Sequence, residues 1–211
     1  TTLFNIITGV FAPTEGHVRF QGRTISGSKA HQIAKLGISR TFQTVELFDN
    51  MTVLENVMVG RHMRIRKDFL GCGLGLPAIA RQENQLRDQA QEILDFIGLG
   101  DKSDTLADNL PLGERKILEI GRALATNPRL ICLDEPAAGL NETETEAAAQ
   151  LVQAIKAKGI TVLLVEHDMN VIMNISDRIA VLNYGEKIAE GTPDQIQADS
   201  KVVAAYLGDT N

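Results

Sequence analysis

Two apolar runs in the second half of the chain have the pattern of strands in a buried parallel sheet. Leu130–Leu133 is unbroken in apolar residues and leads into two adjacent carboxylates, Asp134 and Glu135, before a proline. Thr161–Val165 is a second such run, followed by a carboxylate and then by His167. A continuous apolar run of strand length indicates a strand that is covered on both faces. Open α/β sheets bind ligands at the carboxyl ends of their strands, so both runs predict a site at that edge.

The segments around these runs carry helix signals. Leu110–Leu124 opens with a glycine turn and continues as a helix, and Asn141 has the position of a cap for a helix over Glu142–Lys158. A third strand is predicted over Ile38–Gln43. Strands that alternate with capped helices predict a doubly wound α/β core, and we expect residues 1–211 to form a single domain.

Residues 52–109 are predicted to form a helical subdomain inserted within this α/β core. Thr52 and Glu55 form the T-x-x-E pattern of a capping box ahead of an apolar helix. From Arg61 to Leu99 the pattern is mainly helical. The apolar positions at helical spacing are Leu86, Ala90, Ile93, Leu94 and Ile97, and Gly98 is a natural stop. The apolar, glycine-rich stretch Phe69–Ala80 is too short to span a membrane, and we interpret it as a loop packed on these helices; the alternative is a patch that docks on a membrane surface.

The positions of glycine and proline residues predict two short hairpins and one more helix. Pro13–Ile25 is expected to form a turn and a short strand pair. Arg178–Asn183 and Lys187–Ala189 flank a Tyr-Gly pair and are expected to form a second hairpin. Thr192, followed by proline and later glutamine, has the pattern of a helix cap.

Composition narrows the class of protein. Of the 211 residues, 44% are hydrophobic, which is sufficient for a real core. The net charge is −6 and no basic block stands out, so we expect no nucleic-acid partner. The chain has two cysteines, and Cys132 lies inside a predicted buried strand; a disulfide framework is therefore not expected, and a reducing cytoplasm fits. No apolar run has the length of about 18 residues that a membrane span needs.

The carboxylate pair Asp134–Glu135 and His167 are the candidate chemical groups. Burying two neighbouring charges costs several kcal/mol unless a cation, a proton or hydrogen bonds compensate, so the pair indicates a metal site. The alternative is a strand that ends in a solvated acidic turn. A lone histidine at a strand end is more often structural than catalytic.

Several motifs in one order distinguish between these interpretations. The chain contains LPLGERKILEIGRAL, then RLICLDEPAAGLN, then TVLLVEHD, and near its end GTPDQI and AYLG. This ordered set resembles the ATPase subunit of ABC transporters and is most similar to the ATPases of branched-chain amino acid importers. The resemblance covers essentially the whole chain. It implies a P-loop NTPase-type ABC ATPase core, with ATP and Mg²⁺ as cofactors.

The resemblance also implies a role for each matched residue. Asp134 would hold Mg²⁺ with the Thr1 hydroxyl and Gln43, Glu135 would be the general base, and His167 would bind the γ-phosphate. The expected nucleotide-binding residues are Thr1, Thr2, Gln43, Asp134, Leu112, Gly113 and Glu114, the last three facing the nucleotide of a second ATPase subunit. Transmembrane permease subunits are the other implied partners. The protein would then work in the cytoplasm, peripherally on the inner face of the cell membrane.

Two motifs depart from the family pattern. Thr1 and Thr2 match the threonines that end a phosphate-binding loop, but its glycines and lysine are missing from the sequence, so we expect an N-terminally truncated ATPase that binds ATP poorly as given. In the signature, Pro111 replaces serine, Leu112 glycine, and Glu114 glutamine. The alternatives are a non-transport ABC ATPase, which would be expected to carry a coiled-coil insert or a second ATPase half, and a non-catalytic fragment.

Overall fold

Three parallel strands form the centre of the protein in a computed structural model that describes residues 1–42, 45–61 and 77–207. Strands β3 (Ile38–Arg40), β4 (Leu130–Asp134) and β5 (Thr161–Val165) pair in the order β3-β4-β5. In the register, Arg40 lies opposite Cys132, and Asp134 lies opposite Val165. Because all three strands run the same way, their carboxyl ends lie at one edge of the sheet, as the sequence predicts.

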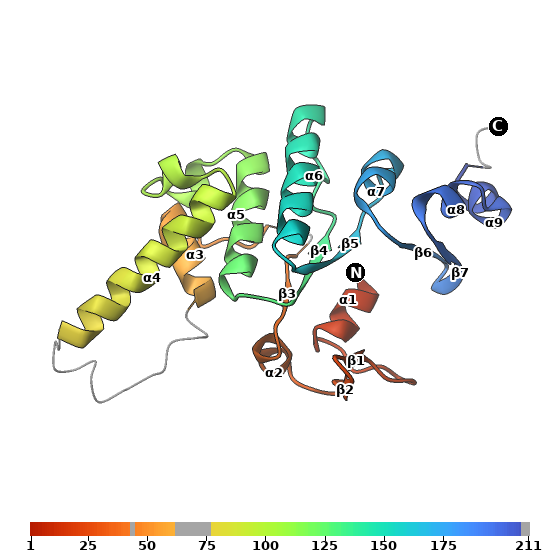
Figure 1. Cartoon of the computed structure of the whole chain (residues 1–211), viewed down its shortest axis with the longest axis horizontal. Helices are drawn as coiled ribbons and strands as arrows, with labels where there is room; N and C mark the ends of the chain where they lie inside the picture. The colour runs from red at the N-terminus through yellow and green to blue at the C-terminus, as the bar shows by residue number, and fades with distance from the viewer. Residues whose placement is uncertain (43–44, 62–76, 208–211) are drawn as a thin grey trace.

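Strand β4 is buried on both faces, which confirms the interpretation of its continuous apolar run. Ile131 and Leu133 belong to one hydrophobic cluster, and Cys132 belongs to another. The first cluster includes residues of α5 (Leu112–Ala125) and α6 (Glu142–Ala157). The second includes Phe4 of α1 (Thr2–Ile7) and Ile33 of α2 (Ala30–Lys35). Neighbouring side chains of a strand point to opposite faces, so this strand packs on helices from both sides (Figure 1).

Two strands differ from the sequence-based prediction. β5 was expected to be a buried core strand, but its residues Val162–Val165 are only half-buried, since among the described strands it pairs with β4 alone. The strand expected over Ile38–Gln43 ends at Arg40. Thr41 N–H still donates to Cys132 O, whereas Phe42 N–H donates to the carboxylate of Glu119 on α5, which draws the chain away from the sheet. Gln43 lies outside the described residues.

The described part of residues 52–109 is helical. It contains α3 (Val53–Arg61), α4 (Pro77–Phe96), and the short 3₁₀ helices η2 (Gly100–Lys102) and η3 (Ala107–Asn109). The predicted capping box is present: Glu55 N–H donates to Thr52 Oγ1 over 3.1 Å, and Thr52 N–H donates to Glu55 Oε2 over 2.8 Å. Gly60 lets α3 approach α5 closely, because an added Cβ would lie 2.3 Å from Arg122 O. Whether residues 52–109 form a separate subdomain stays a prediction.

The loop predicted over Phe69–Ala80 is wrong for its last four residues, which form the start of α4. Proline is tolerated in the first turn of a helix, because its missing N–H group has no partner there, so Pro77 does not prevent this earlier start. The rest of that predicted loop lies outside the described residues.

Both predicted hairpins are present. β1 (Arg19–Phe20) and β2 (Arg23–Thr24) form the first, and β6 (Ile179–Asn183) and β7 (Glu186–Gly191) form the second. The two central residues of the second turn, Tyr184 and Gly185, have φ angles of 48° and 86°, as a two-residue turn of type I′ requires. The short helices α7 (Met169–Ile175), α8 (Pro193–Gln197), α9 (Ser200–Val202) and η4 (Val203–Leu207) complete the fold.

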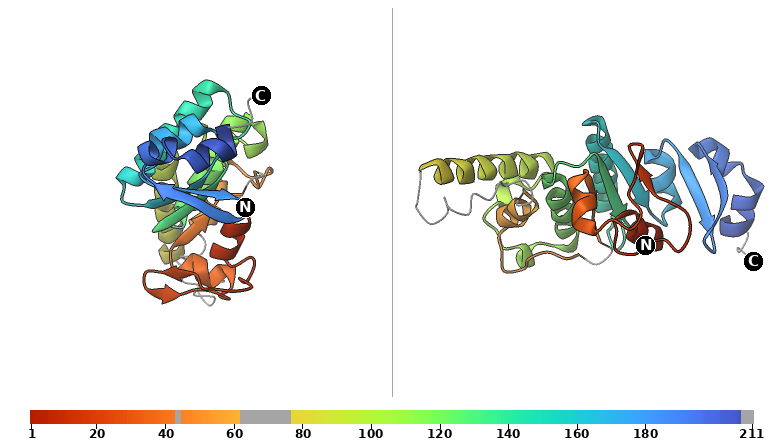
Figure 2. Two further views of the ribbon diagram at one scale, coloured as in Figure 1. Left: turned by 90° about the vertical axis from the view of Figure 1, so that its right-hand side faces the viewer. Right: turned by 90° about the horizontal axis from the view of Figure 1, so that it is seen from below.

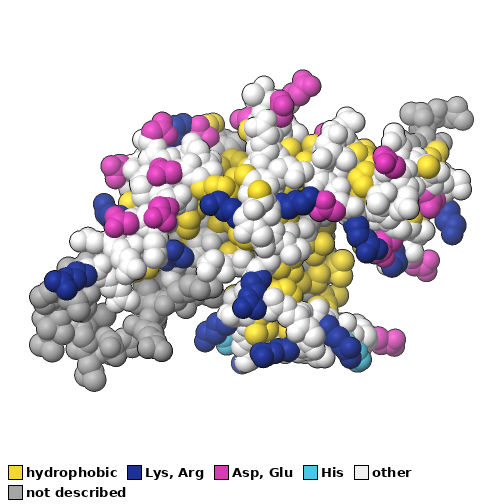
Figure 3. Space-filling view, viewed as in Figure 1, with side chains coloured by type: hydrophobic (Ala, Val, Ile, Leu, Met, Phe, Trp, Pro, Cys, Tyr) yellow, Lys and Arg dark blue, Asp and Glu magenta, His cyan; other side chains and the backbone are white. Residues whose placement is uncertain are grey.

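The elements give an elongated molecule with α4 at one end and the β6–β7 hairpin with α8 and α9 at the other (Figure 2). On the face shown in Figure 3, Lys and Arg side chains surround the lobe that contains β1, β2 and α2, and hydrophobic side chains gather near α1. Leu3, Val10 and Phe11 are among the exposed hydrophobic residues. Among the described residues, none of the helices combines the length and the apolar character that a membrane span requires.

Candidate functional site

Asp134 is the buried carboxylate at the end of β4. Its side chain is fully buried, and Oδ2 accepts a hydrogen bond from Arg40 Nη2 over 2.8 Å. Arg40 is itself 6% exposed and donates through Nη1 to Asn5 Oδ1, so the guanidinium is held from two sides. The second carboxylate oxygen, Oδ1, accepts no hydrogen bond from the described residues and lies 4.0 Å from the amino nitrogen of Thr1. One oxygen of a buried carboxylate is therefore left available for a ligand.

This arrangement fits Mg²⁺. Magnesium is usually bound by one or two carboxylates together with water and substrate phosphates, and less often by a cage made of protein alone. Asp134 Oδ1 offers one such oxygen, and the described residues contain no cluster of three or more His, Cys, Asp or Glu side chains that could hold a metal without help. The expected ligands Thr1 and Asp134 lie close together, whereas Gln43 is outside the described residues.

Glu135 and His167 meet beyond the ends of β4 and β5. Glu135 Oε1 lies 2.8 Å from His167 Nε2, and Glu135 N–H donates to Val165 O over 2.9 Å. The glutamate side chain is 14% exposed and the histidine side chain is 75% exposed, so the pair lies at the boundary with solvent. A carboxylate and an imidazole in direct contact can accept and donate protons. These are the functional groups that general acid–base catalysis uses.

The backbone of Glu135 is strained. Its φ angle is 51°, in the left-handed region, and the next residue is Pro136, which normally restricts the residue before it to an extended conformation. A conformation of this kind costs about 1–3 kcal/mol and persists only where the surrounding structure holds it. In this conformation the Glu135 side chain contacts His167, so the residues that hold the turn are part of the site.

Two residues that the sequence analysis did not single out hold the turn that follows β4. Lys116 Nζ, from α5, donates to Glu135 O over 3.1 Å and to Ala138 O over 2.5 Å. Glu166 Oε1, at the end of β5, accepts from Ala137 N–H over 2.7 Å. Burial lowers the pKa of Lys116, while the neighbouring carboxylates, Glu166 first among them, act in the opposite direction. Lys116 interrupts the apolar pattern of its helix, and this was the sequence signal that could have indicated its contact with the turn after β4.

The N-terminus of α5 carries the signature residues. Pro111 is the cap of this 14-residue helix and makes no side-chain capping bond. Leu112 is 48% exposed, whereas Gly113 is buried beneath Glu144, whose Oε1 would lie 2.6 Å from an added Cβ. Glu114 Oε1 accepts from Lys102 Nζ over 2.5 Å. Thr2, another expected nucleotide-binding residue, is the first residue of α1.

Glu119 anchors the segment that leads to Gln43. Its side chain is 5% exposed and accepts the hydrogen bond from Phe42 N–H over 3.0 Å. Burial raises the pKa of Glu119, although the Phe42 N–H bond and Arg122 lower it in part. The chain therefore leaves β3 at a point set by a buried carboxylate of α5.

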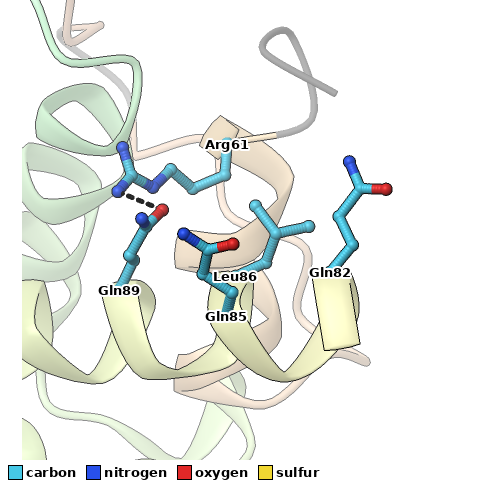
Figure 4. A pocket seen from close by; sticks show the side chains of 5 residues that line it. All are labelled: Arg61, Gln82, Gln85, Leu86 and Gln89. Carbon is cyan, nitrogen blue, oxygen red and sulfur yellow. Dashed lines mark hydrogen bonds between the residues drawn. The ribbon is translucent and has the colours of Figure 1, made fainter. Parts of the chain in front are cut away.

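A hollow lies between the end of α3 and α4 and is lined by Arg61, Gln82, Gln85, Leu86 and Gln89 (Figure 4). Arg61 Nη2 donates to Gln89 Oε1 over 2.6 Å. None of these five side chains is a carboxylate, an imidazole or a nucleophile. The hollow thus lacks the groups that the ends of β4 and β5 provide.

Comparisons with known proteins agree with the motifs. The sequence profile of the ABC transporter family matches residues 1–138, and that of the branched-chain amino acid ATP-binding cassette transporters matches residues 186–210. The high-affinity branched-chain amino acid transport ATP-binding protein BraF of Pseudomonas aeruginosa is 42% identical over 210 residues, which are 99% of this chain and 82% of BraF.

Solved structures show the same fold. The ADP conformation of MJ1267, an ATP-binding cassette of an ABC transporter, is 35% identical with a TM-score of 0.81, covering 99% of this chain and 83% of MJ1267. The dimeric cassette MJ0796, bound to ADP and Pi in a post-hydrolysis state, is 28% identical with a TM-score of 0.74, covering 91% of this chain and 79% of that cassette. With the motifs, the fold and these matches in agreement, the chain belongs to the ATP-binding cassette proteins of the ABC transporter family.

Proposed function

We propose that this protein binds and hydrolyses ATP at the carboxyl ends of β4 and β5 and thereby powers an importer for branched-chain amino acids. The observation that carries the proposal is the contact of Glu135 with His167, 2.8 Å apart, in the residues that follow the buried carboxylate Asp134. General-base chemistry and cation binding are the two functions that phosphoryl transfer requires of protein side chains, together with accurate positioning.

Each side chain has a proposed role. Glu135 accepts the proton of the attacking water, and His167 donates a hydrogen bond to the γ-phosphate and orients that water. Asp134 would hold Mg²⁺ through a water molecule, together with the Thr1 hydroxyl and Gln43, while Arg40 donates to Asp134 Oδ2. When bound, Mg²⁺ supplies positive charge to the terminal phosphates. Thr2 belongs with Thr1 to the phosphate-binding end of α1.

The signature residues are proposed to act on the nucleotide of a second ATPase subunit. In α5 the helix begins at an exposed surface, with Leu112 half in solvent. The backbone N–H groups at a helix N-terminus favour an anion such as a phosphate, even though proline replaces the serine here. Gly113 and Glu114 complete the proposed contact. The dimeric cassette MJ0796 supports a pair of subunits.

The transport role and its substrate are supported by the relatives. BraF is named a transport ATP-binding protein for branched-chain amino acids. We propose the same substrate class, with transmembrane permease subunits as partners, at the inner face of the cell membrane. Residues 52–109 are proposed to form the helical subdomain that transmits closure of the dimer to those partners through Gln43.

The decisive experiment measures ATP hydrolysis by the complete protein. We expect Mg²⁺-dependent turnover in the wild-type protein and in the control Lys156→Met, which changes an exposed lysine of α6 paired with Asp177. His167→Ala should lower turnover by about 10²-fold, in the range of general acid–base contributions. Normal turnover in that variant would contradict the proposed site.

A second measurement tests the substrate. After reconstitution with its permease subunits in proteoliposomes, the protein should drive ATP-dependent uptake of labelled leucine, isoleucine or valine. Uptake of an unrelated solute in place of these amino acids would disprove the substrate class without affecting the ATPase assignment.

A further inference from the structure

The strained turn that contains Glu135 is held by two charged side chains from different elements. In the Glu135–Ala138 turn, the carbonyl groups of Glu135 and Ala138 accept hydrogen bonds from Lys116 of α5. The N–H group of Ala137 donates to Glu166, which follows β5. Within the turn, Ala138 N–H donates to Glu135 O over 3.2 Å. Three of the four residues of the turn therefore have a backbone group bound by a side chain or by another residue of the turn.

Lys116 is suited to this task because of where it lies. The residue is 8% exposed, and its ammonium group donates to two carbonyl oxygens. An ammonium group offers three donors and no acceptor, which suits it to bind two carbonyl oxygens at once. Its stem is anchored one turn into α5, so the turn is fixed to the helix that also carries the signature residues.

Glu166 closes the other side of the turn. Its Oε1 accepts from Ala137 N–H, and its Oε2 accepts from the N–H group of His167 over 3.2 Å. One carboxylate thus binds the backbone of both strand ends that supply the pair Glu135–His167. Charge-assisted hydrogen bonds are stronger than neutral ones, and here a cation binds the carbonyl groups and an anion binds the N–H groups.

We propose that Lys116 and Glu166 are positioning residues, which hold Glu135 in its left-handed conformation and so keep its carboxylate in contact with His167. Neither residue is proposed to touch nucleotide or water. The strained φ angle of 51° is the reason that such a clamp is needed, since a residue before proline would otherwise relax to an extended conformation. This inference deepens the proposed function and rests on it.

The first test measures amide hydrogen exchange in the complete protein without nucleotide. In Glu166→Ala, the Ala137 amide should exchange at least about tenfold faster, because it loses its acceptor. Glu166→Gln should stay near the wild-type rate, since the amide oxygen still accepts. In Lys116→Met, the Ala138 amide should exchange faster by a similar factor. Wild-type exchange in both Glu166→Ala and Lys116→Met would overturn the proposal.

The second test separates positioning from general stability. Lys116→Met should lower kcat at least about tenfold with less than about threefold change in KM for ATP, because the base moves while the nucleotide contacts remain. Its Tm should change by less than about 3 °C, since burying the ammonium group is itself costly and its loss offsets the lost hydrogen bonds. Lys156→Met is the matched control and should leave all three quantities unchanged.

The two tests fail in different ways. If the wild-type protein hydrolysed no ATP, the proposed function would be wrong, and the exchange rates would still decide whether the clamp holds the turn. If the wild-type protein hydrolysed ATP and Lys116→Met kept the wild-type kcat, the function would stand and the positioning role of Lys116 would be wrong.

Discussion

The carboxyl ends of β4 and β5 and the N-terminus of α5 are both candidate nucleotide-binding regions, but they are built differently. At the strand ends, Asp134 is buried against Arg40, and Glu135 contacts His167. At the N-terminus of α5, Leu112 is half in solvent and the helix has no side-chain cap. A region held by buried charges within one chain can carry the chemistry itself. A region that is exposed and uncapped is better suited to meeting a ligand bound by another subunit.

Replacing the general base should have the largest effect. In the complete protein, Glu135→Gln should lower ATP turnover by about 10²–10⁴-fold, because the amide keeps the shape of the side chain but cannot accept a proton. ATP binding, measured by calorimetry, should remain largely intact. A variant that hydrolysed ATP at the wild-type rate would show that Glu135 is not the base and would remove the main difference between the two regions.

Breaking the buried ion pair should have the next largest effect. Arg40→Met leaves Asp134 as an uncompensated buried charge, which typically costs about 3–5 kcal/mol. For a protein of this size we expect the Tm to fall by about 10 °C in a thermal scan. The control is Arg178→Met, which removes a partner of Glu190 in an ion pair whose arginine is 73% exposed. If both variants lost equal stability, burial would not distinguish the strand ends from the surface.

The ion pair at the N-terminus of α5 should matter little for stability. Lys102→Met removes the partner of Glu114, but both side chains are about one-third exposed, at 37% and 30%. Partly exposed pairs contribute about 0–1 kcal/mol. We therefore expect a change in Tm of less than about 3 °C. A loss as large as that of Arg40→Met would show that buried charge holds this region as well.

Cys132 offers the smallest and most local test. Burial in β4 raises its pKa from 9.0 to about 12, with Arg40 lowering it and Asp134 raising it in addition. The folded chain should therefore show no reaction of Cys132 with a thiol reagent at pH 8, whereas the denatured chain should react. Because the pKa is raised on folding, the thiol's contribution to stability is full below pH 9 and is lost as the pH rises toward 12. Rapid labelling of Cys132 itself in the native chain, located by peptide mapping, would contradict the burial of β4.

The success of the sequence-based predictions depended on whether a signal was local. Asn141 caps α6 as predicted, with its side chain accepting from Glu144 N–H, because a capping box needs only residues a few positions apart. The end of β3, in contrast, was predicted three residues too late, at Gln43 instead of Arg40. It depends on Glu119, which lies 77 residues from Phe42 in the sequence and gives no local sign of that contact.

The features of the candidate site also fall into those that neighbouring residues indicate and those that depend on tertiary contacts. The sequence by itself determined the strand β4, its buried cysteine and the adjacent acids, since a continuous apolar run and its polar end are properties of a few neighbouring residues. Only the tertiary structure decided that Arg40 would neutralise Asp134, and that Lys116 and Glu166 would hold the turn around Glu135. These partners lie up to 94 residues away along the chain. Packing of the helices on the sheet brings these residues together, and the hydrophobic periodicity of the sequence does not indicate such contacts.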